Sequence, residues 1–515
     1  MLAVVHSYAL LGIDAVPVRV EVDLATGAFP SLTLVGLPDA AVRESRERIV
    51  AALRNQGLAY PDRKITVNLA PAGLRKEGVA FDLPIAIGIL VASGQASPER
   101  LGEMAWAGEL SLDGRIRPVR GSLSMAIRER SRKPSRALVL PKGNGVEASA
   151  VEGARICEVS SLRDVVALLL DGATRFLFSG SDRVPPPAGD PAILSEDLCD
   201  VRGQVAARRA IEVAAAGGHN LLLIGSPGTG KSMLAERMPG IQPPMRRMEQ
   251  LEATMVHSAA GLLPAGSGLI AQRPFRAPHH TVSRVGLIGG GRPPRPGEIS
   301  LAHRGVLFLD ELPEFYRDVL EGLRQPLESG TVTIVRAGAR VTFPCRFQLI
   351  AAMNPCPCGQ RFDPRGGCRC TPRQIAMYVG RISGPLLDRI DLHVEMAHVS
   401  FQEMSLLRPA EDSRTVRVRV TAAWERQQAR FANSERVSFN AQMSLAEIRQ
   451  HCRLSDGPLG LLRMAMSRLA LSPRGYHRVL KVARTIADLA GQEEMGEEHV
   501  AEAIAYRVLD RGKGG

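Results

Sequence analysis

A glycine-rich segment between an apolar strand and a helical run limits the fold of this chain more than any other feature. Residues 221–224 are four consecutive apolar side chains, the pattern of a parallel strand buried on both faces. A helical run begins at residue 233. The motif G-x-x-x-x-G-K-S between them predicts an α/β domain built on a phosphate-binding loop. The loop consists of Gly225, Ser226, Pro227, Gly228, Thr229, Gly230, Lys231 and Ser232.

The residue types in this loop suit ATP with Mg²⁺. Its glycines let backbone N–H groups turn toward phosphates, and the start of the following helix adds the positive end of its dipole. Lys231 is predicted to reach the β- and γ-phosphates, and Ser232 to ligate Mg²⁺. The alternative is a glycine-rich turn that arises by chance, which the flanking strand and helix disfavour.

Two further apolar runs, 306–309 and 348–352, are also predicted to be buried strands, and each ends in polar residues. Asp310 and Glu311 follow the first run, and ligands of open α/β sheets bind at the carboxyl ends of strands. Asp310 suits the Mg²⁺ shell, and Glu311 suits the base that orients the attacking water. Two surface carboxylates at a strand end are the alternative.

Asn354 follows the second of these runs and precedes a proline. Its side chain could hold the water beside the γ-phosphate. Asn-Pro is also a common start of a turn, so a purely local role is the alternative.

Composition separates three regions. Residues 1–172 alternate short β-rich runs with helical ones, and 173–194 form a linker rich in Pro, Gly and Ser. Residues 195–400 form the α/β core, and 401–515 are rich in helices. The expected strands outside the core are 65–69 and 136–140, and the expected helices are 41–55, 83–94, 414–430, 458–471 and 476–490.

The overall composition is that of a globular protein with a basic excess. Of the 515 residues, 65 are Lys or Arg and 53 are Asp or Glu, which gives a formal charge of +12 and permits binding to a polyanion. No apolar run approaches the ~20 residues that span a bilayer. We therefore expect a cytoplasmic protein without a membrane partner.

Four of the eight cysteines lie between 356 and 370. Two C-x-C pairs enclose nine residues, and four thiolates can complete a tetrahedral Zn²⁺ shell with a structural role. The alternative is a set of four reduced thiols. The predicted ligands are Cys356, Cys358, Cys368 and Cys370.

Several motifs resemble the ComM/YifB family of magnesium-chelatase-like AAA+ ATPases over nearly the whole chain. The most specific stretches are Gly36-Leu37-Pro38-Asp39, Asn68-Leu69-Ala70-Pro71, Lys76-Glu77-Gly78, Phe81-Asp82-Leu83-Pro84, Phe275-Arg276-Ala277-Pro278-His279-His280 and Gly384-Pro385-Leu386-Leu387-Asp388-Arg389-Ile390-Asp391. The resemblance implies an AAA+ core, a helical C-terminal lid and a homohexameric ring with nucleotide between subunits.

Within that ring, the resemblance assigns two arginines to catalysis. Arg389 resembles the arginine finger that a subunit donates to its neighbour's ATP, and Arg474 resembles the sensor-2 arginine of the lid. A guanidinium is always charged and can grip phosphate oxygens in a fork. A surface salt bridge is the alternative for either residue.

The resemblance also implies a β-hairpin before Asn354, with strands at 331–335 and 339–343. Arg336 and Arg340 are then candidates to face a central pore through which a nucleic-acid backbone passes. A solvated hairpin with ordinary charges is the alternative.

Residues 1–172 resemble the C-terminal α+β domain of Lon protease. A Lon site needs a nucleophilic serine and a lysine base. The positions after Gly78 hold no serine, and those after Gly121 hold no lysine, so proteolysis is not expected. A binding or ring-scaffolding platform is the better hypothesis.

The resemblance implies a DNA motor, a branch-migration helicase for recombination intermediates in natural transformation, with single-stranded or branched DNA as partner. The alternatives are a motor subunit of magnesium chelatase or another protein-remodelling ATPase. The chain contains no D-x-S-x-S adhesion motif of the chelatase partner subunit.

Overall fold

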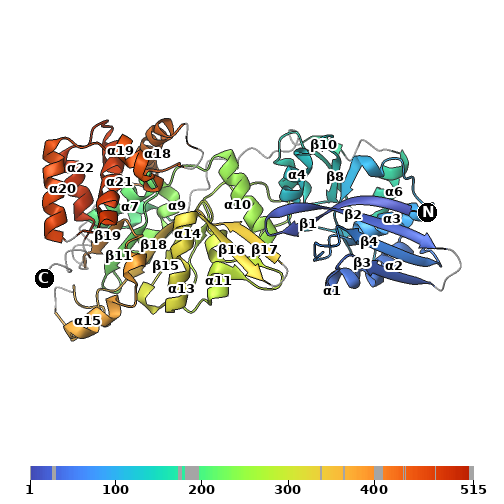
Figure 1. The fold of residues 1–515 in the computed structure, drawn as a ribbon, viewed down its shortest axis with the longest axis horizontal. Coiled ribbons are helices and arrows are strands. Elements are labelled where there is room, and N and C mark those ends of the chain that lie inside the picture. The colour runs from blue at the N-terminus through green and yellow to red at the C-terminus, as the bar shows by residue number, and fades with distance from the viewer. Residues whose placement is uncertain are drawn as a thin grey trace.

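Three parts follow one another along the long axis of the protein: an N-terminal region around a mixed sheet, an α/β core, and a group of C-terminal helices (Figure 1). This computed structural model describes residues 2–25, 30–171, 177–179, 196–336, 339–362, 366–398, 410–432, 434, 437–469, 471–507 and 509.

Alternating side chains build the N-terminal sheet. Along β2 buried and more exposed residues alternate, as expected for a strand with one face on a core. In the described residues the sheet has eight strands in the order β10-β9-β8-β5-β1-β2-β4-β3. These strands are β1 (Leu2–Leu11), β2 (Asp14–Ala25), β3 (Ser31–Val35), β4 (Lys64–Ala70), β5 (Met104–Trp106), β8 (Ala137–Pro141), β9 (Arg155–Val159) and β10 (Leu177–Ser179), with a separate small pair β6 (Glu109–Leu110) and β7 (Ile116–Arg117).

Helices cover both faces of this sheet. Every residue of α3 is buried, which fits a helix that is apolar all round. Helices α2, α3 and α6 share one hydrophobic cluster with the sheet, and α4 and α5 share the cluster of the opposite face. The helices are α1 (Ala40–Arg43), α2 (Ser45–Asn55), α3 (Asp82–Ala92), α4 (Ser122–Arg130), α5 (Gly145–Ser149) and α6 (Leu162–Asp171).

Two details of this region differ from the expectation. The helix predicted over 41–55 is divided at Glu44 into α1 and α2. Residues 177–179, inside the predicted linker, form β10, which pairs antiparallel with β9 at the edge of the sheet. The rest of that linker lies outside the described residues.

The core contains a five-stranded sheet in the order β12-β15-β18-β11-β19, and all four pairings are parallel. All carboxyl ends of these strands therefore lie at one edge of the sheet. The three predicted apolar runs are β11, β15 and β18, and every residue of each is buried. The strands are β11 (Leu221–Gly225), β12 (Phe275–Arg276), β15 (Val306–Leu309), β18 (Gln348–Met353) and β19 (Leu392–Met396).

Helices and short strands surround the core sheet. They are α7 (Val205–Gly217), α8 (Lys231–Glu236), α9 (Met238–Ile241), α10 (Arg247–Ala260), α11 (Arg284–Ile288), β13 (Gly289–Gly290), β14 (Arg295–Pro296), α12 (Glu298–Leu301), α13 (Arg317–Gly322), α14 (Arg324–Ser329), β16 (Thr331–Arg336), β17 (Ala339–Pro344), α15 (Pro372–Val379) and α16 (Gly384–Leu387). Strands β16 and β17 form the predicted antiparallel hairpin.

The C-terminal helices pack against α7 and share its hydrophobic cluster with one face of the core sheet. The three helices expected in this part are α18, α20 and α21. The elements are α18 (Ser413–Arg430), α19 (Leu445–His451), α20 (Asp456–Leu469), α21 (Pro473–Ala490) and α22 (Glu497–Ala505).

Helix α10 fastens the N-terminal region to the core. Leu251 and Met255 of α10 pack against the N-terminal cluster that includes α4. The Arg247 guanidinium donates to the Ala150 carbonyl at 2.5 Å, and the Gly121 N–H donates to Ser258 Oγ at 2.9 Å. The two parts are thus joined by both apolar and polar contacts.

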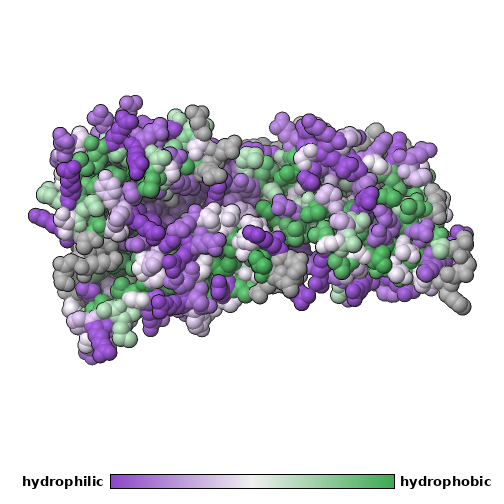
Figure 2. All heavy atoms as spheres, in the orientation of Figure 1, coloured by the Kyte–Doolittle hydropathy of each residue, from purple (hydrophilic) through white to green (hydrophobic). Residues whose placement is uncertain are grey.

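Hydrophilic side chains are spread along the whole length of the face in Figure 2. In the part of the chain that the structure describes, no helix combines the length and apolar character that a membrane span requires.

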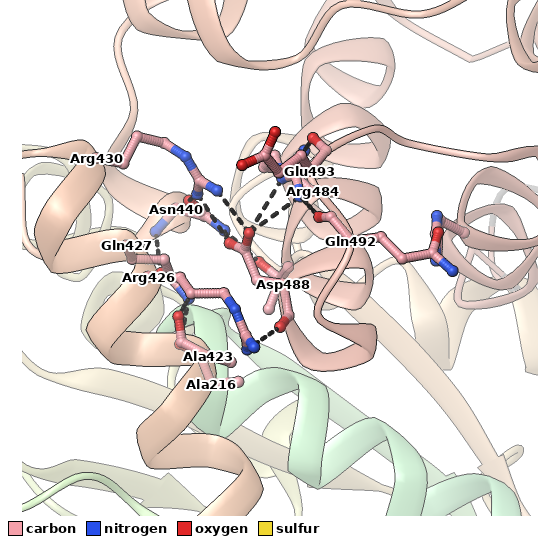
Figure 3. Close-up of polar contacts among 12 residues, drawn as sticks. Ala216, Ala423, Arg426, Gln427, Arg430, Asn440, Arg484, Asp488, Gln492 and Glu493 are labelled. Atoms are coloured by element: carbon pink, nitrogen blue, oxygen red, sulfur yellow. Dashed lines mark hydrogen bonds and ion pairs between the residues drawn. The ribbon is translucent and has the colours of Figure 1, made fainter.

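A buried carboxylate holds the C-terminal helices together (Figure 3). Asp488 of α21 is fully buried and accepts hydrogen bonds from the Arg430 guanidinium of α18 at 2.6 and 2.8 Å. Asn440 donates to the same carboxylate at 2.7 Å, and Arg484 donates at 3.2 Å. Gln427 of α18 links this network to the Ala216 carbonyl of α7 at 2.9 Å.

We expect the substitution Asp488→Ala to destabilise this part of the protein by about 3–5 kcal/mol, because it leaves the buried guanidinium group of Arg484 and the partly buried one of Arg430 without their counter-charge. The chain has two tryptophans, Trp106 in β5 and Trp424 in α18. Urea unfolding followed by Trp424 fluorescence in a Trp106→Phe background therefore reports on the C-terminal helices.

The matched control is Glu425→Ala, which removes an exposed carboxylate from α18. Its effect should stay within about 0.5 kcal/mol. If Asp488→Ala costs no more than this control, the network does not stabilise the C-terminal helices.

Candidate nucleotide-binding site

The phosphate-binding loop connects β11 to α8, as the motif predicts. Gly228 and Gly230 have φ values of +79° and +87°, a backbone conformation that favours glycine. A Cβ atom built at either position meets no atom within 4 Å, so the space beside the loop backbone is open. Ser226 Oγ is buried and has no hydrogen-bond partner among the described residues. The loop therefore offers room and free polar capacity for a phosphate chain.

Lys231 is the first residue of α8 and is 9% exposed. Its Nζ donates to the carbonyls of Gly225 and Ser226 at 2.8 and 3.0 Å. Burial lowers the pKa of the Lys231 ammonium, and the carboxylates of Asp310 and Glu311 oppose that shift. The lysine is thus a partly desolvated cation held over the loop.

Ser232 lies next to the acidic pair. Its Oγ donates to Asp310 Oδ2 at 2.7 Å, and the Glu311 N–H donates to Asp310 Oδ1 at 2.8 Å. Glu311 has a φ of +52° and a largely exposed side chain. A hydroxyl and a carboxylate in contact form the oxygen donor set that Mg²⁺ prefers.

Asn354 lies directly after β18, between the loop and the acidic pair in the strand order. Its Oδ1 accepts a hydrogen bond from Lys231 Nζ at 3.3 Å. The structure therefore brings together Lys231, Ser232, Asp310, Glu311 and Asn354 at the carboxyl edge of the core sheet.

His280 is a site residue to which sequence reasoning assigned no role. Its Nδ1 lies 3.2 Å from Glu311 Oε2, and its ring lies 4.1 Å from that of His279. The segment before it forms β12, which pairs with β15 and so ends beside the acidic pair. The motif around His280 contributed to the family resemblance, and its position after a short strand could have indicated this contact.

Arg389 and Arg474 lie at the other edge of the sheet. The Arg389 carbonyl accepts a hydrogen bond from Asn220, the residue before β11, at 2.8 Å. The loop follows the carboxyl end of this five-residue strand. At about 3.3 Å per residue, roughly 17 Å separate the two ends, which an arginine side chain cannot bridge.

Both arginines line one cavity of about 970 Å³ between the core and the C-terminal helices. Arg389 is 9% exposed, pairs with Glu328 and donates to the Pro385 carbonyl at 2.6 Å, while its Nε has no partner among the described residues. Arg474 is exposed.

The two hairpin arginines are only partly described. Arg336 ends β16, and its side chain lies outside the described part of the structure. Arg340 of β17 is exposed. Among the described side chains, Arg340 makes no hydrogen bond or ion pair with the phosphate-binding loop.

The four clustered cysteines come together after β18. Their Sγ atoms all lie within 4.8 Å of one another, with separations of 3.4 Å from Cys356 to Cys358 and 3.7 Å from each of these to Cys368. Four sulfurs at about 2.3 Å from a zinc ion are about 3.8 Å apart, so this donor set fits tetrahedral zinc.

The thiols of the cluster differ in the direction in which their pKa values are shifted. A backbone N–H from Gln360 lowers the pKa of Cys358, whereas burial raises the pKa of Cys356. Residues 363–365, in the predicted turn between the pairs, lie outside the described residues. Cys157, Cys345 and Cys452 are single buried residues, and Cys199 is half-buried.

Three family models match successive parts of the chain: subunit ChlI of Mg-chelatase over residues 20–144, magnesium chelatase subunit ChlI over 197–404, and the C-terminal part of that subunit over 410–507.

Two of the most similar relatives cover the whole chain. Protein YifB of Escherichia coli and the competence protein ComM of Haemophilus influenzae are each 44% identical to it, over 99% of this chain and 98% of the relative. The 38 kDa subunit of magnesium chelatase from Acidiphilium rubrum is 26% identical over 56% of this chain and 82% of that subunit. The fold, the loop and these similarities agree, and the chain belongs to the ComM/YifB family of magnesium-chelatase-like AAA+ proteins.

Proposed function

We propose that this protein is an ATP-driven DNA motor: a homohexameric branch-migration helicase that acts on recombination intermediates in natural transformation. The observation that supports ATP hydrolysis is the contact between the phosphate-binding loop and the acidic pair, where Ser232 meets Asp310 at 2.7 Å. DNA as the substrate is supported by the similarity to the competence protein ComM and by the charge of +12. We place the motor in the cytoplasm, where ATP and chromosomal DNA are both present.

The chemistry follows from the groups at the carboxyl edge of the sheet. Lys231 binds the β- and γ-phosphates, while Ser232 and Asp310 hold Mg²⁺, which neutralises phosphate charge when bound. Glu311 orients the attacking water and accepts its proton, and Asn354 positions that water. His280, at 3.2 Å from Glu311, is placed to orient this carboxylate.

The position of the two arginines favours a ring. Arg389 and Arg474 lie at the amino edge of the sheet, roughly 17 Å from their own loop on the scale of a five-residue strand. They can serve catalysis only at the ATP of another subunit. In a ring, the amino edge of one core would face the loop of the next.

A magnesium-chelatase motor subunit is the second candidate. The matches to ChlI models and to the Acidiphilium rubrum subunit favour it, although identity to that subunit is 26% against 44% to the competence protein. The cysteine cluster departs from the chelatase pattern, whereas residues 20–144 match a model of a chelatase subunit. Stimulation of ATP hydrolysis by a protein partner and not by DNA would favour this candidate.

ATP turnover by the wild-type protein should rise on addition of four-way DNA junctions and should drive their branch migration. The substitution Lys231→Ala should abolish both, since it removes the cation that binds the phosphates. Glu311→Gln should still bind ATP but should lower turnover by about 10²–10⁴-fold, the contribution of a general base. A steady-state phosphate-release assay and a fluorescent-nucleotide titration measure the two quantities.

Glu314→Gln is the matched control, because Glu314 is a neighbouring carboxylate that forms an ion pair with Arg381 at 2.9 Å. Its turnover should remain close to that of the wild type. Unchanged turnover in both Lys231→Ala and Glu311→Gln would remove the ATPase assignment, and a wild type insensitive to every DNA form would remove the DNA assignment.

Subunit mixing tests the arginine in the neighbouring subunit. Homogeneous Arg389→Ala rings should lose about 10³–10⁵-fold in turnover, the contribution of an arginine finger. Mixtures of Arg389→Ala with Lys231→Ala subunits should regain activity, because some interfaces then combine an intact loop with an intact Arg389. Mixtures of Arg474→Ala with Lys231→Ala subunits test Arg474 in the same way.

A mixture of Lys231→Ala with Glu311→Gln is the control. Both changes lie at the same edge of one core, so no interface regains a complete site and activity should stay low. If the arginine mixtures also stay inactive, Arg389 does not act on a neighbour's nucleotide.

We also propose that the cysteine cluster holds a structural zinc ion. The wild-type protein should contain one zinc per chain by mass spectrometry of the metal, and Cys358→Ser should lower this content. Cys199→Ser, outside the cluster, should leave it unchanged. Wild-type protein that carries no zinc, even after incubation with the ion, would contradict the proposal.

A further inference from the structure

A cavity of about 1160 Å³ lies where the N-terminal region meets the core. Its N-terminal wall comes from the end of β1 and the turn after it, from residues 37–43, which include α1, and from the loop 73–77. Its core wall comes from residues 291–294 and from β17. Figure 1 shows the β16–β17 hairpin reaching the N-terminal sheet beside β1. None of these residues belongs to the nucleotide site.

The two walls are fixed relative to each other. A Cβ atom built at Gly12 would lie 2.5 Å from Val341 of β17, so the turn after β1 approaches the hairpin closely. Leu11 and Ile13 pack against the hydrophobic cluster of the core. The cavity therefore lies in an interface where the N-terminal region and the core pack directly against each other.

The N-terminal wall is itself braced. The Asp39 N–H donates to the Lys76 carbonyl at 3.0 Å, and the Lys76 N–H donates to the Leu37 carbonyl at 3.1 Å. The Lys76 side chain is fully buried, and its ammonium donates to the Pro71 carbonyl. These bonds connect residues 37–43 to residues 73–77, and so fix the positions of the segments that carry Arg43 and Arg75.

The charge of the cavity is strongly positive. Its lining includes the exposed Arg43, Arg75, Arg292 and Arg340, and its one lining carboxylate is Glu77, 3.5 Å from Arg75. Among the described residues, no carboxylate forms an ion pair with Arg43, Arg292 or Arg340 within 4.0 Å. Three guanidinium groups are thus available to a ligand.

The arginines that line the cavity favour a ligand with phosphate groups. Guanidinium groups bind phosphate oxygens in a fork, and their separation over two walls suits a ligand with several phosphates. The lining between the arginines consists of leucine, proline, valine and glycine and has no aromatic side chain on which bases could stack, so contacts to phosphates would supply the affinity without reading a sequence. The volume exceeds the ~300–1,000 Å³ of a small-molecule pocket, which favours an extended ligand.

We infer that this cavity binds the phosphate backbone of single-stranded DNA, with the N-terminal region holding the strand through Arg43 and Arg75 and the core through Arg292 and Arg340. The inference rests on the proposed DNA motor and gives the N-terminal region a direct part in substrate binding. Arg340 belongs to both the hairpin and the cavity, so the strand runs from one to the other.

The test is the double substitution Arg43→Ala with Arg75→Ala, measured by fluorescence anisotropy with labelled oligothymidylate. Loss of two phosphate contacts should weaken binding about 10-fold or more and should lower the slope of log K against log salt by about 1.4, at about 0.7 per phosphate. ATP turnover without DNA should not change, because neither residue contacts the loop.

The matched control is Arg63→Ala with Arg155→Ala, which removes the same charge from exposed positions of the N-terminal region that do not line the cavity. Binding and salt slope should stay close to those of the wild type. Equal losses in the control and the test variant would overturn the inference, since the arginines would then act only through net charge.

Three further outcomes separate the inference from the proposed function. If wild-type protein binds no oligothymidylate but four-way junctions stimulate its ATP turnover, only the cavity site is overturned. If no DNA form binds or stimulates the wild-type protein, the DNA motor and the cavity site are both overturned. If wild-type protein binds but the test variant binds equally well, only the cavity site falls.

Photocrosslinking of an iodouridine-labelled strand gives an independent measurement. Crosslinked peptides should include residues 37–43 or 73–77 in the wild type. Crosslinks confined to the core would contradict the proposed site.

Competition with polyglutamate of the same total charge is a second test. If polyglutamate displaces the strand, the proposed site is contradicted, because the cavity would then bind any polyanion, including an acidic protein.

Discussion

The hydrogen bond from Ser232 to Asp310 is the contact on which the nucleotide site depends. It joins the start of α8, which follows the loop after β11, to the residue after β15. Strands β11 and β15 are separated by β18, so their backbones lie two strand spacings, about 10 Å, apart. The hydrogen bond forms because the strands are parallel and in register, with Ile224 opposite Met353 and Leu309 opposite Ala351. A slip of one residue would turn Asp310 to the other face of the sheet. Asn354 fills the position between them and contacts Lys231.

The groups at this edge could be predicted from sequence because each follows a strand with a distinctive local pattern. Residues 221–224, 306–309 and 349–352 are uniformly apolar, a pattern typical of parallel strands covered on both faces. Once three such strands share a sheet, the polar residues after them meet at one edge. The C-terminal helices were similarly apparent from their amphipathic pattern, whereas the lid and the ring came from family resemblance alone.

Other features depend on contacts between distant parts of the chain and left no local signal. His280 reaches Glu311 through β12, a strand of two residues too short to produce a recognisable pattern. The three residues of β10 join the N-terminal sheet from within a Pro-rich and Ser-rich stretch. The sequence also did not indicate at which edge of the sheet Arg389 lies. That position depends on the path of the chain from Asn354, at the carboxyl edge, through α15 and α16 to the amino end of β19.

The proposed DNA site and the nucleotide site are connected by one short stretch of chain. Strand β17 runs from Arg340 at the basic cavity to Pro344, and β18 then runs from Gln348 to the position before Asn354. Between the two strands, Cys345 donates to the Gly330 carbonyl at 2.9 Å, and the Arg346 carbonyl accepts from the Arg304 N–H at 2.7 Å. Both strands pack into the same hydrophobic cluster, and densely packed interiors pass strain from one element to its neighbours. In the proposed motor, a strand of DNA that pulls on Arg340 would therefore act on Asn354, which contacts Lys231, the residue proposed to bind the phosphates.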